Sequence, residues 1–179
     1  MKEFASKFLP AHSQILMTLA MIVLVVHSWS VRFYFFRFPS YMLYLDIGQL
    51  AAVFAYYMAF ALLESLAFLL ILLVVQAILP ANWYRNAFAV TSFPVVLAAA
   101  ISAYLLQNTL TNDYPGARFL ILWAAATLAA MVALVLLVRL LKPATKLVNF
   151  LAEQISIMNF LYIPIGVISL IVVLVRLVI

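Results

Sequence analysis

The sequence predicts an all-α polytopic membrane protein, a bundle of about five transmembrane helices. Hydrophobic residues occupy 70% of its 179 positions and charged residues 8%, whereas soluble domains have roughly 45 to 50% and about 25%. Ten Lys and Arg with five Asp and Glu cannot cover the outside of a soluble domain of this size, so lipid must cover much of it. Five apolar runs with short connections predict one membrane domain over residues 1–179.

The first span is expected at residues 9–28. Two lysines precede it, as in a signal peptide, and residues 28–30 offer small side chains at a spacing suited to cleavage. Cleavage there would leave a chain that starts with Val31-Arg32-Phe33. We therefore expect an uncut anchor helix, long enough to cross the hydrocarbon core.

Residues 29–46 are expected to form an interfacial segment rich in aromatic and basic side chains. Aromatic rings with a polar edge prefer the membrane boundary, and arginine can lay its stem over apolar surface while its head stays in water. The simplest interpretation is a belt at the headgroup level, and the alternative is one wall of a pocket for a lipid, quinone or pigment. Its main candidate residues are Trp29, Arg32, Arg37, Tyr41 and Tyr44.

Residues 47–79 form an apolar run of 33 positions. As a helix this run would be about 50 Å long, well beyond the ~30 Å hydrocarbon core. Two spans would need a turn, but residues 61–65 contain no Gly, Pro or Asn. We therefore expect one long helix, tilted or projecting from the bilayer, which stops at Pro80.

Three further spans follow in the second half of the chain. A polar turn around Asn112 to Gly116 and the Lys142-Pro143 pair separate them. Residues 144–159 mix polar side chains with apolar ones at helical spacing, which predicts an amphipathic interfacial segment. The expected spans are residues 86–107, 119–141 and 160–175, with Pro94 and Pro164 inside the first and last of them.

The distribution of basic residues predicts the orientation. With the N-terminus in the cytoplasm and five spans, six Lys and Arg lie inside and four lie outside. We therefore expect an integral protein of the bacterial inner membrane with its C-terminus outside. The inner set is Lys2, Lys7, Arg85, Arg139, Lys142 and Lys146, and the outer set is Arg32, Arg37, Arg118 and Arg176.

Rows of small residues predict which helices pack together, because membrane helices approach closely where small side chains repeat every four positions. Such rows occur in spans two, three and four and are missing from spans one and five. We therefore expect a compact unit of spans two to four, with spans one and five on its flank facing lipid or partner subunits. The rows are Ala51, Ala55 and Ala59; Ala99 and Ala103; and Ala125, Ala129 and Ala133.

Glu64 is the only carboxylate deep inside an apolar run, where an unpaired ionisable group costs on the order of 3 kcal/mol or more. Tyr57 shares its helix face and Ser65 adjoins it, so these three residues form the candidate buried polar site. We expect a hydrogen bond from Glu64 within the bundle. The alternatives are a contact with a partner subunit or cofactor, and proton handling.

The sequence contains no pattern that predicts catalysis, a resident cofactor or a metal site. It has no Cys, and no G-x-S-x-G, phosphate loop or H-E-x-x-H is present. His12 and His27, its only histidines, are too few for zinc, and we expect both near the lipid headgroups. Basic residues stand singly at segment ends, which argues against nucleic acid as a partner.

The five-span layout with an external C-terminal end resembles the membrane anchor of lipoteichoic-acid-synthase-like and phosphoethanolamine-transferase-like enzymes. Those enzymes carry an external hydrolase-like domain after the fifth span, and this sequence shares no motif with them, so the resemblance is one of layout. The leading hypothesis is a non-catalytic subunit in the lipid bilayer that scaffolds or seals a larger complex, with other membrane subunits or copies of itself as partners. The alternatives are a small proton-coupled transporter centred on Glu64 and an anchor related to those transferases.

Overall fold

The computed structural model describes residues 10–78, 87–110 and 116–178. All regular structure in these ranges is helical, and five of the six helices are long and apolar enough to cross a membrane. The protein is therefore an all-helical, multi-pass membrane protein, as predicted. The five long helices are α2 (His12–Met42), α3 (Ile47–Ile78), α5 (Phe88–Thr109), α6 (Ala117–Leu140) and α8 (Met158–Val178), and the short one is α7 (Lys142–Ile155).

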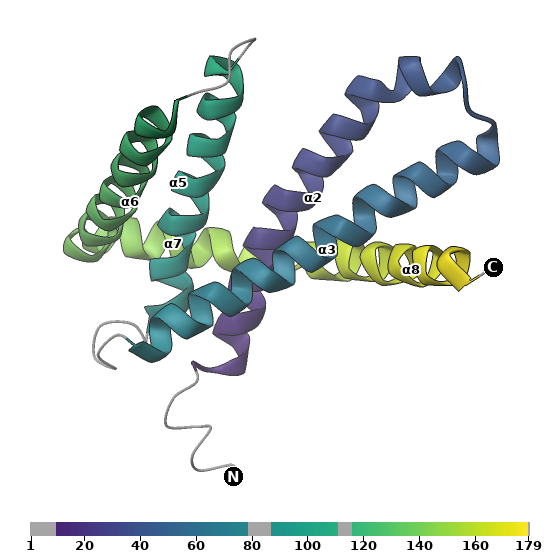
Figure 1. Cartoon of the computed structure of the whole chain (residues 1–179). Helices are drawn as coiled ribbons and strands as arrows, with labels where there is room; N and C mark the ends of the chain where they lie inside the picture. The colour runs from purple at the N-terminus through teal and green to yellow at the C-terminus, as the bar shows by residue number, and fades with distance from the viewer. Residues whose placement is uncertain (1–9, 79–86, 111–115, 179) are drawn as a thin grey trace.

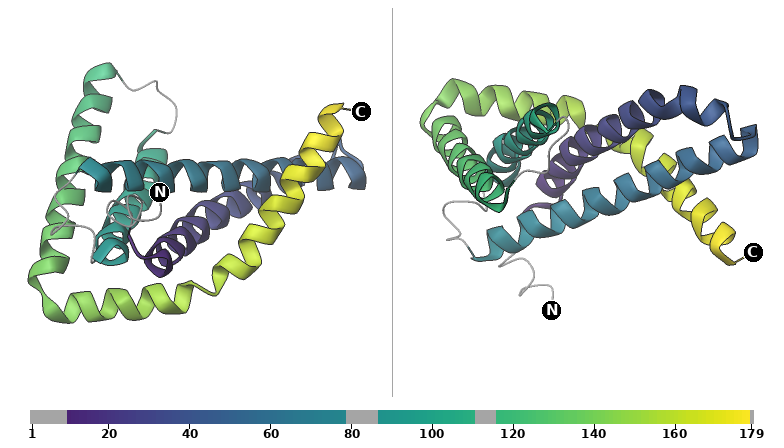
Figure 2. Two further views of the ribbon diagram at one scale, coloured as in Figure 1. Left: turned by 90° about the horizontal axis from the view of Figure 1, so that it is seen from below. Right: turned by 45° about the horizontal axis from the view of Figure 1, so that its top comes forward.

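The helices form two hairpins, α2–α3 and α5–α6, and the short helix α7 then connects α6 to the last helix, α8. A short turn joins α2 to α3, and α5 packs against α6 beside them (Figure 1). From the end of α6, α7 runs past α5 and α2 and leads into α8, which crosses α3 (Figure 2). The C-terminal end of α8 thereby lies on the same side as the α2–α3 turn.

The first helix is longer than the sequence analysis expected. α2 continues without a break from His12 to Met42, so one helix covers both the expected span at residues 9–28 and most of the expected interfacial segment at residues 29–46. Residues 29–38 contain no Gly or Pro that would interrupt the helix, and Pro39 lies only in its last turn. A helix of 31 residues is about 46 Å long, so its aromatic end projects well beyond one hydrocarbon thickness or the whole helix tilts.

The second helix agrees with the expectation of one uninterrupted run. α3 covers Ile47–Ile78. Its first turn is capped from both directions: the Gln49 backbone N–H donates to Asp46 Oδ1 at 2.7 Å, and the Asp46 backbone N–H donates to Gln49 Oε1 at 3.1 Å. This reciprocal pair satisfies two of the N–H groups that a helix start leaves without partners. Pro80, the expected stop, lies outside the described residues.

The core forms where α2, α3 and α5 meet. Phe88, at the start of α5, is fully buried there, and its backbone N–H donates to Gln14 Oε1 of α2 at 2.8 Å. A smaller cluster joins α5, α6 and α7 through Val90, Val138 and Val148. The main cluster contains Leu19, Ile22, Val23, Leu69, Leu72, Phe88 and Val96.

The expected grouping of spans two to four is wrong. The main partners of α3 are α2 and α8, whereas those of α5 are α6 and α2. The small-residue row of α3 does provide close approach, since Ala52, Ala55 and Ala59 are buried, but the neighbours differ from those expected. A row of small residues marks a face that admits another helix without specifying which helix it admits.

Candidate functional site

Glu64 lies on the exposed side of α3, about midway along the helix. Within the described residues it makes no hydrogen bond or ion pair, and Phe60 and Ala67 beside it on this face are exposed too. The expected hydrogen bond within the bundle is therefore not formed in this part of the chain. The position of Glu64 in the middle of an apolar run did not show which side of α3 the other helices cover.

The two hydroxyl residues grouped with Glu64 have other partners. Ser65 is fully buried and donates to the Ala61 carbonyl of its own helix at 2.7 Å. The Tyr57 hydroxyl lies 3.2 Å from the Tyr41 hydroxyl of α2. The structure does not bring the three residues together as one polar site.

His27 is fully buried where α2, α3 and α8 cross. Its ring centroid lies 5.2 Å from that of Tyr162. A Cβ atom on Gly166 would lie 3.4 Å from its Nε2. The sequence analysis expected His27 at the end of a span, whereas α2 extends to Met42 and so places His27 at the midpoint of the helix.

The hydrogen bonding of His27 uses one ring nitrogen. Nδ1 lies 3.1 Å from the Val23 carbonyl oxygen, which assigns the proton to Nδ1 in a neutral ring. Nε2 then carries a lone pair and has no hydrogen-bond partner among the described residues. The same residues contain no group of three or more His, Cys, Asp or Glu that could hold a metal ion, and His12 is exposed at the other end of α2.

The aromatic and basic segment divides between two neighbouring helices. On one side, Trp29 packs edge-on against Tyr104 of α5 with ring centroids 6.3 Å apart. The guanidinium carbon of Arg32 lies 5.7 Å and 5.4 Å from these two ring centroids, close enough for cation–π attraction. Arg37 and Tyr44 are exposed.

On the other side of the segment, Tyr34 is the buried centre of an aromatic cluster with α3. Its ring centroid lies 5.1 Å from that of Phe54 and 5.9 Å from that of Tyr57. Its hydroxyl donates to the Leu50 carbonyl at 3.3 Å. The segment therefore holds α2 to both α3 and α5 at one end of the molecule.

The α6 helix is covered along one narrow line only. Trp123 Nε1 donates to Ser102 Oγ of α5 at 2.9 Å, and Ser102 Oγ lies 2.7 Å from Thr127 Oγ1. Val138 is the only buried residue of this helix. The row formed by Ala125, Ala129 and Ala133 is exposed, so α6 presents a small-residue face with no helix against it in the described structure.

The sequence analysis missed two features of the structure. One is the buried position of His27 where three helices cross. The sequence feature that could have indicated it is the absence of a helix breaker in residues 29–38, which makes α2 long and places His27 at its midpoint. The other is a groove between α3 and α8 that carries Asp46 at one wall and Arg176 at the other. Its signal was the helical spacing of Ser169, Val172 and Arg176, which places these side chains on one face.

Comparison with known proteins found no matching family model, no matching curated protein and no matching solved structure.

Proposed function

We propose that this chain is a non-catalytic membrane subunit that binds other membrane subunits through the outer face of α3 and the exposed row of α6. The observation that carries the proposal is the position of Glu64. Its side chain faces outward from the middle of a membrane-spanning helix, with no partner in the described part of the chain. An unpaired Glu64 side chain that faces hydrocarbon would destabilise the protein by on the order of 3 kcal/mol or more. A hydrogen bond to a polar group of a neighbouring subunit would remove that cost.

The exposed face of α6 supports the same proposal independently. Helices in membranes associate where small residues allow the backbones to approach, and Ala125, Ala129 and Ala133 supply such a row over two turns. This row lies on a helix in which Val138 is the only buried residue. A scaffolding or sealing subunit needs faces of this kind for the proteins that it holds.

The alternative of a proton-coupled transporter receives less support from the geometry. A proton pathway needs several titratable groups within reach of each other or of a water-filled cavity. Glu64 faces outward, whereas His27 is buried at the crossing of three helices. Neither residue lines the groove between α3 and α8.

The proposal is tested by isolating the chain from its own membrane under gentle extraction. We expect a particle larger than the chain that contains other proteins. Glu64→Leu and Ala129→Leu should each reduce the amount of co-isolated protein by tenfold or more, about 1.4 kcal/mol of association free energy. The first removes the polar group that the partner contacts, and the second adds a side chain that keeps the partner helix from approaching α6 closely.

Leu174→Ala provides the matched control, since Leu174 is exposed on α8 away from both faces. This variant should co-isolate the same proteins as the unchanged chain. A particle that contains only this chain would overturn the proposal, and so would equal recovery of partners with all three variants. Because the sequence has no Cys, a single cysteine at Ala67 or Ala129 can also cross-link the expected partners in the intact membrane.

A further inference from the structure

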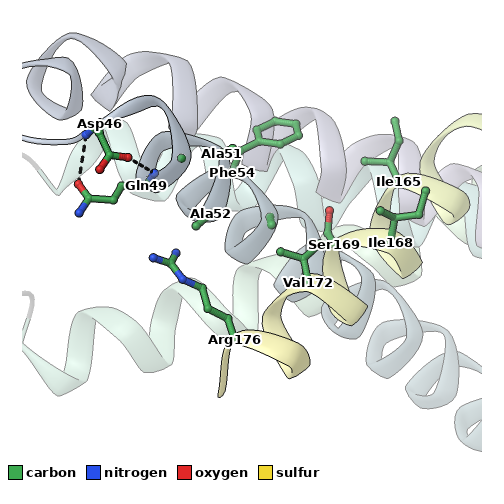
Figure 3. Close-up of a pocket in the computed structure, with 12 residues that line it drawn as sticks. Asp46, Gln49, Ala51, Ala52, Phe54, Ile165, Ile168, Ser169, Val172 and Arg176 are labelled. Carbon is green, nitrogen blue, oxygen red and sulfur yellow. Dashed lines mark hydrogen bonds between the residues drawn. The ribbon is translucent and has the colours of Figure 1, made fainter. Parts of the chain in front are cut away.

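The groove between α3 and α8 combines a charged mouth with an apolar interior. It has a volume of about 750 Å³, within the range of roughly 300 to 1,000 Å³ found for small-molecule sites. Small residues of α3, among them Ala51 and Ala55, form one wall, and branched residues of α8, among them Ile168 and Val172, form the other (Figure 3). The interior therefore offers hydrocarbon contacts along its length.

Two opposite charges face each other across the mouth. Asp46 stands at the start of α3, where one carboxylate oxygen caps the helix through Gln49 N. The Arg176 side chain extends from α8 toward the end of α3 that carries Asp46 and Gln49 (Figure 3). Within the described ranges Arg176 makes no hydrogen bond or ion pair, and Asp46 makes no ion pair. The mouth thus holds one cation and one anion, on opposite walls, that are not paired with each other.

Ser169 adds a polar group deeper in the groove. It is only 6% exposed, it lines the groove, and its hydroxyl has no hydrogen-bond partner in the part of the chain that the structure describes. It lies two helical turns from Arg176, about 10 Å along the helix axis. From the mouth inward the groove therefore presents two charges, one hydroxyl and apolar walls.

A glycerophospholipid carries its groups in the same order, with a charged headgroup, then ester oxygens, then hydrocarbon chains. We propose that this groove binds one phospholipid with an aminoalkyl phosphate headgroup. Arg176 contacts the phosphate, Asp46 accepts hydrogen bonds from the ammonium group, Ser169 meets an ester oxygen, and one acyl chain fills the apolar part. Charge-assisted hydrogen bonds of this kind are about twice as strong as neutral ones, and both charged residues lie at helix ends, where headgroups are found.

The test uses the full chain, purified and exposed to equal amounts of phosphatidylethanolamine, phosphatidylcholine and phosphatidylglycerol, with bound lipid counted by native mass spectrometry. We expect preferential retention of one phosphatidylethanolamine. The ammonium group of phosphatidylethanolamine has N–H donors for Asp46. The ammonium group of phosphatidylcholine has no N–H donor, and phosphatidylglycerol has no ammonium group. Arg176→Gln should lower the retention of phosphatidylethanolamine about tenfold, the scale of one lost charge-assisted hydrogen bond.

Asp46→Asn separates the headgroup charge from the helix cap. Asparagine caps a helix as well as aspartate does, so the variant keeps α3 intact while removing the anion. It should abolish the preference for phosphatidylethanolamine over phosphatidylglycerol. Ala51→Leu should reduce retention of all three lipids, because Ala51 is exposed within the groove and a larger side chain would fill it.

Two matched controls lie on other faces of the molecule. Arg118 is exposed on α6 and Ala67 is exposed on α3, and neither lines the groove. Arg118→Gln and Ala67→Leu should leave lipid retention unchanged. Retention in the proportions supplied, equal losses with Arg118→Gln and Arg176→Gln, or a helix of another protein cross-linked to a cysteine at Ala51 would each overturn the proposal.

Discussion

Gly166 of α8 lies so close to Leu62 of α3 that a Cβ atom added to the glycine would lie 3.0 Å from the leucine Cβ. Real Cβ atoms are rarely this close to a neighbour, and the Leu62 Cβ is fixed to its backbone. The same added atom would lie 3.4 Å from Nε2 of the buried His27. The three long helices α2, α3 and α8 therefore meet at a point where any larger side chain would force a neighbour to move, and this contact holds α8 beside α3 next to the groove.

We predict that Gly166→Ser separates α8 from α3. Overfilling a packed site typically costs 1 to 3 kcal/mol, and the serine would add two heavy atoms at a position where even the first would press against Leu62. Unfolding in detergent, followed by the fluorescence of the three tryptophans, should show a loss of stability in that range. The matched control is Gly116→Ser, at the N-cap of α6, where an added Cβ meets no atom within 4 Å and serine is a favoured cap. Equal stability of the two variants would contradict the close contact.

The number and extent of most helices followed from the sequence, whereas their partners did not. Residues 47–78 contain no breaker, so one long α3 was predictable. The same rule, applied to residues 29–38, predicts the continuous α2, but the wealth of aromatic and basic side chains there favoured a separate surface segment. Helix neighbours depend on close contacts such as Gly166 against Leu62, and a single glycine in α8 forms no repeating row.

A second prediction concerns the polar contact between α5 and α6. Ser102 Oγ accepts from Trp123 Nε1 and lies within hydrogen-bond distance of Thr127 Oγ1, so Ser102→Ala removes the shared atom. Polar contacts between membrane helices average about 0.6 kcal/mol with a maximum near 1.7, and we expect a loss of stability toward the upper end because Trp123 Nε1 then lacks its acceptor. The emission of Trp123 should shift in the same variant.

Ser28→Ala is the control for this contact. Ser28 is exposed on α2, so its removal should leave both the stability and the emission unchanged. A Ser102→Ala variant that matches Ser28→Ala in both measurements would show that the hydroxyl does not join α5 to α6.

The candidate site was predicted in part by residue type and poorly by position. The sequence singled out Glu64 because an acid in an apolar run is costly wherever it faces, and its exposure on α3, with no partner among the described residues, preserves that argument. Tyr57 and Ser65 were grouped with Glu64 by helix geometry alone. In the structure the Tyr57 hydroxyl is hydrogen-bonded to Tyr41 of α2, and the Ser65 hydroxyl donates to the backbone of α3. The groove could not be predicted, because Asp46 and Arg176 are 130 positions apart and line the same groove only through the path that α7 and α8 take.

The last prediction is that the α2–α3 turn and the C-terminal end of α8 both lie outside the cytoplasm, and α7 inside. Six basic residues on the N-terminal side of the membrane against four on the other favour this orientation, and the structure places Asp46 and Arg176 on one groove. The absence of Cys lets single cysteines report the topology in intact cells. Ser40→Cys, exposed near the end of α2, should react with a membrane-impermeant maleimide, whereas Gln154→Cys, exposed on α7, should react only after permeabilisation. The reverse labelling pattern would show that the protein has the opposite orientation. Labelling of both sites in intact cells would show that they lie on the same side of the membrane, which contradicts the three spans, α3, α5 and α6, between them.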